Sequence, residues 1–183
     1  ILLYILLFYT ISAQTLPDSI LIKIENLSAK EKIDFLLDIS WNFREKNTPL
    51  AIEAGQIAIK LSDSLKLGRK YTLANSYVGV AMLNYAFKTN ESIPYFHSAL
   101  ETALARNDSA QLGYTYNNLA DAFYLTGNAP LALEYSTISL NYFVALNDRR
   151  GIAYTYINLG LVYRFEKEYD LSLDYFNKAI AIR

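Results

Sequence analysis

Cysteine is absent from this chain of 183 residues, and His97 is its only histidine. Without cysteine there is no disulfide framework and no thiol nucleophile. A single histidine leaves too few nitrogen or sulfur ligands for zinc and related metals. Glycine and proline are scarce as well, with 7 and 4 residues, which favours a chain of helices over a turn-rich β-sandwich. We therefore expect a helical protein without a metal site.

An excess of positive charge is also missing, since 17 lysines and arginines stand against 18 aspartates and glutamates. A surface that neutralises phosphates needs a clear basic excess, so a nucleic-acid partner is not expected. The hydrophobic fraction of 52% excludes intrinsic disorder and is enough for a buried core. The composition is that of a folded domain.

No group of residues has the pattern of a catalytic or cofactor site. The sequence has neither the G-x-x-x-x-G-K-[ST] phosphate loop nor the G-x-G-x-x-G turn. His97 lies in the middle of a predicted helix, where a solvent-facing histidine is the simpler interpretation than a general base. Paired carboxylates such as Glu166 and Glu168 have the spacing of solvated helical faces. We expect no enzyme activity and no cofactor.

The first residues form an apolar run with no charge before Asp18. Residues 1–11 followed by the small residues Ser12 and Ala13 resemble the hydrophobic centre and cleavage region of a secretory signal peptide, truncated at its start. We predict a signal peptide over residues 1–14, a linker over 15–27, and export to the periplasm or the extracytoplasmic face of the membrane. The alternative is a buried core helix. Helical periodicity continues to Arg183 without a stop signal, so we also expect a longer natural protein.

An internal repeat is the strongest signal in the remaining sequence, because several groups of residues recur at an offset of 40. The recurring groups are Asn107-Asp108 with Asn147-Asp148, Tyr114-Thr115-Tyr116 with Tyr154-Thr155-Tyr156, and Asn118-Leu119 with Asn158-Leu159. Extending the repeat backwards predicts four units over residues 28–64, 67–106, 108–147 and 148–183. Together they form one domain over 28–183.

Each unit divides into two helical stretches separated by a helix stop. In the third unit, Tyr116, Leu119, Ala120 and Phe123 follow the spacing of one helical face, and Gly127 lies where a helix commonly ends. Helix starts are predicted from a capping box at Ser28 to Glu31, and from capping side chains at Thr48, Asn90, Asp108, Asn128 and Asp148. The fold predicted is an all-α solenoid of four helix-turn-helix units.

This pattern resembles the tetratricopeptide repeat (TPR) family. The residues that carry the resemblance are Tyr156, Leu159, Gly160, Tyr163, Phe176 and Ala179 in the fourth unit, and Tyr116, Leu119, Ala120, Phe123, Gly127 and Ala132 in the third. The period of 40 is longer than the usual repeat of about 34 residues and is similar to a long-helix variant. The resemblance implies a right-handed superhelix whose concave groove, lined by the first helix of each unit, holds a protein or peptide.

The resemblance also implies which side chains line that groove. They are Tyr77, Tyr114, Asn117, Asn118, Asp121, Tyr124, Tyr154, Asn158 and Arg164. Asn118 and Asn158 are the most suggestive, since an amide both donates to and accepts from a peptide backbone, although they could instead bond between neighbouring repeats. Tyr114, Tyr124 and Tyr154 fit groove contact and plain surface equally well. Trp41 falls on the same face by register, but core packing is the safer interpretation there.

Two functions of different classes fit a repeat protein of this kind. The first is the extracytoplasmic sensory region of a bacterial signalling protein, because the arrangement resembles TPR-bearing sensor histidine kinases and membrane-tethered regulators. The second is a free periplasmic or secreted scaffold for protein assembly. A membrane would then be reached only through segments outside the repeats. The apolar face of the last helix, with Phe176 and Ile180, also predicts self-association.

Overall fold

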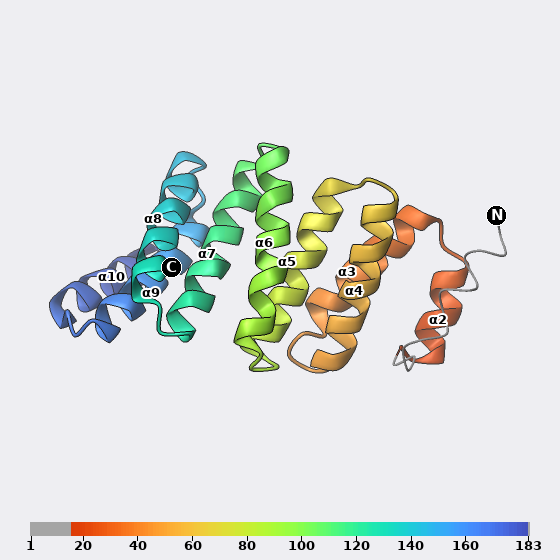
Figure 1. Cartoon of the computed structure of the whole chain (residues 1–183), viewed down its shortest axis with the longest axis horizontal. Coiled ribbons are helices and arrows are strands. Elements are labelled where there is room, and N and C mark those ends of the chain that lie inside the picture. Colours follow the sequence, from red (N-terminus) through yellow and green to blue (C-terminus); the bar gives the residue numbers. More distant parts are fainter. Residues whose placement is uncertain (1–15, 183) are drawn as a thin grey trace.

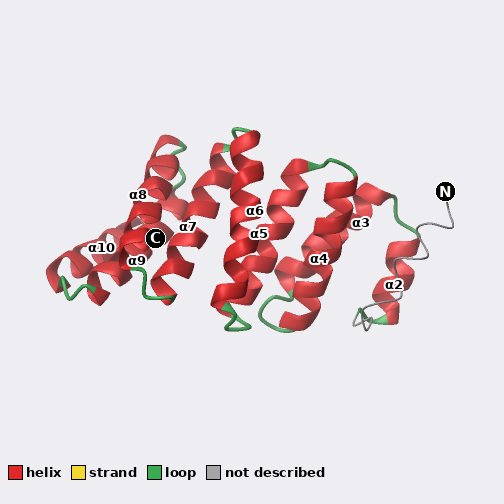
Figure 2. Cartoon of the chain, viewed as in Figure 1, coloured by secondary structure: helices red, strands yellow, loops and turns green. Residues whose placement is uncertain are grey.

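The computed structural model describes residues 16–182, which form nine helices. The predicted signal peptide over residues 1–14 lies outside this part of the chain. The helices are α2 (Asp18–Glu25), α3 (Ala29–Asn42), α4 (Thr48–Ser64), α5 (Gly68–Asn84), α6 (Thr89–Ala105), α7 (Ser109–Leu125), α8 (Ala129–Ala145), α9 (Arg149–Phe165) and α10 (Tyr169–Ile182). Figure 2 shows helices and loops and no strand over the described residues.

From α3 onwards the helices form four antiparallel pairs that stand side by side in chain order, as Figure 1 shows. The first helices of successive pairs (α3, α5, α7 and α9) also pack directly on one another. The second helices (α4, α6, α8 and α10) have no comparable direct packing with each other in the described residues. Because neighbouring units approach more closely on the first-helix side, the stack curves toward that side. The predicted all-α solenoid is confirmed.

Close approach of helices depends on phenylalanine side chains that lie against glycines. An added Cβ at Gly79 would lie 2.4 Å from the ring of Phe96, and one at Gly160 would lie 2.7 Å from the ring of Phe176. Both contacts join the first and second helices of one unit. Phe143 instead touches two units, because Gly113 in α7 and Gly151 in α9 both face its ring. The absence of side chains at these glycines lets the rings fill the core.

Several predicted helix starts are confirmed. Ser28 and Glu31 form the reciprocal capping box, and Asp108, Asn128 and Asp148 each accept a backbone N–H three residues on. Gly127 ends α7 with a positive φ of 78°.

Two other predicted caps are wrong. The cap of α4 is Asn47, which accepts from the backbone N–H of Leu50, while the Thr48 hydroxyl donates back to the carbonyl oxygen of Arg44. Helix α6 already begins at Thr89, so Asn90 lies one residue inside it. In both cases the backbone turns helical earlier than the capping residue chosen from the sequence.

The segment interpreted as a linker contains a short helix. Leu16 and Ile24 at its two ends are buried, and Ile20 and Leu21 pack against the core formed by α3 and α4. Ile20 and Ile24 share one side of α2, and together with Leu16 just before the helix they cover the open side of the first unit. The segment therefore extends the core instead of separating it from the preceding chain.

Candidate functional site

The first helices present one continuous surface, which we call the first-helix face and define by the groove residues predicted above together with Trp41. Residues 114, 117, 118, 121 and 124 of α7 are spaced by three or four, so they share one side of that helix. Their equivalents in α9 share the corresponding side. Some of these side chains bond between neighbouring units, and others make no hydrogen bond to another described residue.

Tyr114 joins the third unit to the fourth. Its hydroxyl donates to Asp148 Oδ2 at 2.7 Å, and its ring meets Phe143 edge-on at 4.8 Å between centroids. Burial, and then the carboxylate of Asp148, raise the pKa of Tyr114 to about 12. Asp148 also accepts from the backbone N–H of Gly151, so it caps α9 and bonds the preceding unit at once. Tyr114 is therefore a structural residue between repeats.

Replacing Tyr114 with phenylalanine is expected to lower the free energy of unfolding by about 1–2 kcal/mol, because Asp148 loses a charge-assisted hydrogen bond. The matched control is Tyr154→Phe, at the same position of the fourth unit. Tyr154 is 42% exposed and its hydroxyl makes no hydrogen bond to another described residue, so little change is expected. Urea denaturation followed by circular dichroism would compare the two variants. Equal losses would contradict the assigned role of Tyr114.

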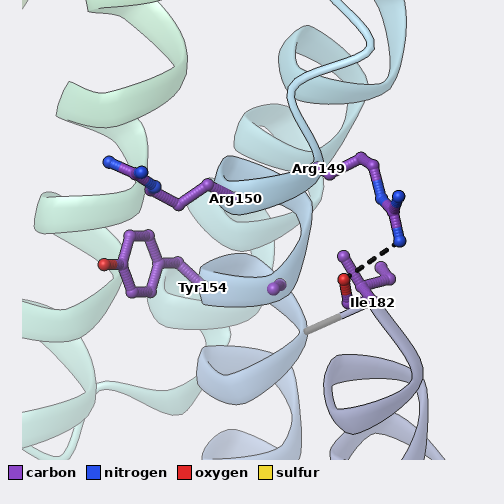
Figure 3. A pocket seen from close by; sticks show the side chains of 5 residues that line it. Arg149, Arg150, Tyr154 and Ile182 are labelled. Atoms are coloured by element: carbon purple, nitrogen blue, oxygen red, sulfur yellow. Dashed lines mark hydrogen bonds between the residues drawn. The ribbon is translucent and has the colours of Figure 1, made fainter.

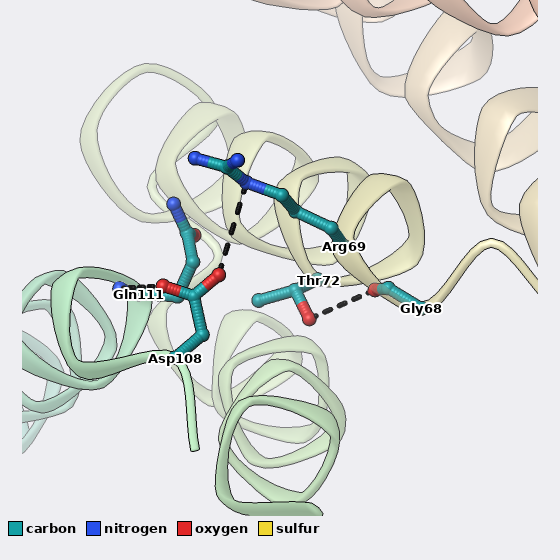
Figure 4. Close-up of polar contacts among 5 residues, drawn as sticks. All are labelled: Gly68, Arg69, Thr72, Asp108 and Gln111. Carbon is teal, nitrogen blue, oxygen red and sulfur yellow. Dashed lines mark hydrogen bonds and ion pairs between the residues drawn. The ribbon is translucent and has the colours of Figure 1, made fainter. Parts of the chain in front are cut away.

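A similar contact joins the second unit to the third. Asp108 caps α7 by accepting from the backbone N–H of Gln111, and Arg69 at the start of α5 lies 3.7 Å from its second oxygen. Figure 4 shows Asp108 between these two partners, with the Thr72 hydroxyl beside it bonded to the carbonyl oxygen of Gly68. The capping aspartates of α7 and α9 thus both reach the first helix of the preceding unit.

Asn117 and Asn158 bond to each other across the boundary between the third and fourth units, which Tyr114 also spans. Asn158 Nδ2 donates to the backbone oxygen and to Oδ1 of Asn117, both at 3.2 Å, and only 8% of Asn158 is exposed. The Thr155 hydroxyl also lies 3.2 Å from Asn117 Oδ1. Of the two asparagines singled out in the sequence, Asn158 therefore holds repeats together. Asn118 is only partly buried, and its side chain bonds to no other residue in the part of the chain described.

Tyr124 and Arg164 lie at the opposite end of these helices. The Tyr124 ring packs edge-on against Phe165, with centroids 6.3 Å apart. Arg164 Nη2 donates to the Tyr124 hydroxyl at 3.4 Å. Arg164 is exposed, whereas Tyr124 is partly buried against the core formed by Ala129, Ala132 and Val162, so only part of the Tyr124 side chain is accessible.

Tyr77 forms an aromatic pair with a residue that the sequence analysis assigned to the core. The rings of Trp41 and Tyr77 lie 4.8 Å apart, and the guanidinium of Arg44 lies 3.7 Å from the Trp41 ring centre. Trp41 is 40% exposed, so the prediction of core packing is wrong. Burial is the main cause that raises the pKa of Tyr77, followed by Asp38. The helical register of Trp41 indicated this face, but the repeat pattern of the first unit is too weak to establish that register. No sequence pattern indicated a role for Arg44.

Asp121 is the acidic residue at the centre of the face. It is partly buried, and burial alone raises the pKa of its carboxyl from 3.8 to about 6. Neither a hydrogen bond nor an ion pair to another described residue compensates this charge. A carboxylate held in this way is attractive to a cation.

A pocket of about 290 Å³ lies at the edge of the fourth unit, between the start of α9 and the end of α10. Figure 3 shows Arg150 and Tyr154 on one side of it and Arg149 bonded to the backbone oxygen of Ile182 on the other. In the third unit the equivalent Tyr114 is covered by Phe143 and Asp148. The pocket is thus the open counterpart of a boundary between repeats.

Residues 16–182 contain neither a metal-binding cluster nor a membrane-spanning helix. No group of three or more histidine, aspartate or glutamate side chains is arranged to hold a metal ion there. None of the helices there combines the length and apolar character needed to cross a membrane.

Comparison with known proteins bears on the repeat itself. The family model described as tetratricopeptide repeat matches residues 111–183, which cover the last two helix pairs. None of the curated proteins compared with the chain matches it. Helices α3 to α6 continue the same paired packing toward the N-terminus. Residues 111–183 are therefore tetratricopeptide repeats, and the helical repeat that continues over α3 to α6 supports a tetratricopeptide repeat protein.

Proposed function

We propose that this protein binds an extended peptide segment of another protein along its first-helix face. Membership of the TPR family supports a protein-interaction module without chemistry of its own. The observation that carries the proposal is the row of exposed or partly exposed aromatic and amide side chains on successive first helices. From the first unit to the fourth they are Trp41, Tyr77, Asn118, Tyr124 and Tyr154.

These residue types suit peptide recognition for physical reasons. Tryptophan and tyrosine provide large contact areas at a small cost in side-chain entropy. The Asn118 amide can donate to a peptide carbonyl and accept from a peptide N–H at once. The preformed Trp41–Tyr77 pair at 4.8 Å means that little ordering is needed on binding.

Trp41→Ala and Asn118→Ala are each expected to weaken peptide binding by about 10-fold or more, because one removes a large aromatic contact and the other the amide that bonds the peptide backbone. The probe is a set of peptides selected from a random library of about 12 residues on the immobilised chain, with affinities measured by fluorescence anisotropy. Val144→Ala on α8 is the matched control, since Val144 is 54% exposed on a second helix. Equal affinities for all variants, or a library that yields no binders, would refute the proposed function.

We further propose that the protein acts outside the cytoplasm as the sensory region of a bacterial signalling protein. The apolar run at residues 1–11 supports export, and the long repeat period supports the sensor resemblance. A reporter enzyme that requires disulfide formation, fused after Arg183, is expected to be active in cells. An inactive but soluble fusion would count against export.

Self-association through the last helix pair is the final part of the proposal. Ile180 is 71% exposed, and Leu173 and Tyr169 are also exposed on α10. Exposed apolar side chains on one helix favour burial against a second copy. Sedimentation velocity at rising concentration is expected to show association that Ile180→Glu abolishes. A monomer at every concentration would contradict this.

A further inference from the structure

The position of Asp121 is defined by its neighbours along α7. It is the only charged residue of that helix, and it lies one turn from Asn117 on one side and from Tyr124 on the other. Both of these neighbours contact α9, through Asn158 and Phe165 respectively. Asp121 therefore lies along the line where α7 and α9 meet, in the middle of the first-helix face.

The same two contacts show what α9 offers opposite Asp121. Asn117 and Asn158 are 41 residues apart in sequence, and Tyr124 and Phe165 have the same separation. Asp121 lies between Asn117 and Tyr124 on α7. The same separation of about 41 residues therefore places Leu161 and Val162 of α9 opposite Asp121. Both side chains are apolar and cannot donate a hydrogen bond. This explains how the carboxylate loses solvent without gaining a partner.

Charges on the other helices do not compensate Asp121 either. Neither α6 nor α8 contains a lysine or arginine. The two cations of α5 lie in its first turn and already have partners, since Arg69 pairs with Asp108 and Lys70 pairs with Asp34. Among the cations of α9, Arg149 and Arg150 also lie in the first turn, and Arg164 bonds to Tyr124. Helices α5 and α9 carry no acidic residue. The centre of the face thus has one negative charge and no cation paired with it.

We propose that Asp121 selects peptides by pairing with the cationic side chain of a lysine or arginine in the segment bound on the first-helix face. This inference rests on the proposed peptide binding and adds the chemistry of the ligand. A carboxylate that has already lost much of its hydration gains more from a cation than a solvated one does. Tyr124, one turn away, offers an aromatic ring to the same side chain. Asn118 lies beside them for the peptide backbone.

The test uses the full chain and the random peptide library described above. Selection on the wild-type protein is expected to enrich lysine or arginine at one fixed position of the recovered peptides. Selection on Asp121→Asn, which keeps the shape but removes the charge, is expected to lose that preference. Glu134→Gln is the matched control, because it removes an equal charge from the second helix of the same unit and should keep the preference.

A double-mutant cycle then links the preference to this residue. Replacing the enriched basic residue of a selected peptide by norleucine is expected to weaken binding to the wild-type chain about 10-fold or more, and to Asp121→Asn less than 2-fold. Peptides selected without a basic preference, or a preference that persists on Asp121→Asn, would overturn the role of Asp121 and leave peptide binding intact. A library that yields no binders at all would overturn both.

Discussion

Replacing Phe143 with alanine is expected to lower the free energy of unfolding by about 3–5 kcal/mol, because a large, fully buried ring is removed. Phe143 is fully buried, and its ring lies against the backbones of Gly113 in α7 and Gly151 in α9. Because helices on both sides are held by other contacts, they cannot close the cavity that the ring would leave. The loss should therefore combine the transfer free energy of the ring with the cost of a cavity.

Urea denaturation would measure the loss, and Val144→Ala provides the control. Val144 is the next residue in α8 but is exposed, so truncating it should change the free energy of unfolding by less than about 0.5 kcal/mol. A loss below about 1 kcal/mol for Phe143→Ala would mean that the units relax around the cavity. The third and fourth units would then be less tightly coupled than their packing indicates.

Asp121→Asn is expected to stabilise the protein at neutral pH, and the gain should grow with pH. Burial raises the pKa of Asp121 from 3.8 to about 6, so the folded chain binds this proton more tightly than the unfolded chain does. The wild-type protein therefore loses stability as pH rises from about 4 through 6, while the asparagine variant does not. The difference should grow from about 0.5 kcal/mol at pH 4 to roughly 2–3 kcal/mol at pH 8.

Thermal and urea denaturation across that pH range would measure the difference. Carbon-13 chemical shifts of the Asp121 carboxyl would report its titration directly, with an expected midpoint near 6. A difference in stability that does not change with pH, or a midpoint near 3.8, would contradict a desolvated carboxylate. A charge that costs stability where asparagine would not is the kind of residue that function retains, which agrees with its proposed role in peptide selection.

The fold was largely predictable because its information is local and repeated. The helical spacing of Tyr116, Leu119, Ala120 and Phe123 and caps such as Asp108 lie within one unit, and the pattern recurs in the next unit at an offset of 40 residues. The errors arose where neighbouring units or neighbouring residues compete. Asn47, and not the adjacent Thr48, caps α4. The apolar residues of α2 pack into a core that we had expected to begin only at residue 28.

The candidate site was predictable only as a set of positions. Register placed Asn118 and Asn158 on the same face, but it could not tell that Asn158 bonds to Asn117 while Asn118 stays open. The same holds for Tyr114, which bonds to Asp148, and for Tyr154, which does not. Identical residues in identical registers differ because they meet different residues of a neighbouring unit: Asn158 meets Asn117 of the preceding unit, and Tyr114 meets Asp148 of the following one.

By itself, the sequence of this protein determined the helical class, the repeat and the side of each helix on which a residue lies. Periodicity and capping act over a few residues, so they can be read without knowing the neighbours in space. Only the tertiary structure decided which polar side chains are consumed between repeats and that Asp121 is left desolvated without a partner. Those outcomes depend on what packs across each boundary, which no single repeat contains.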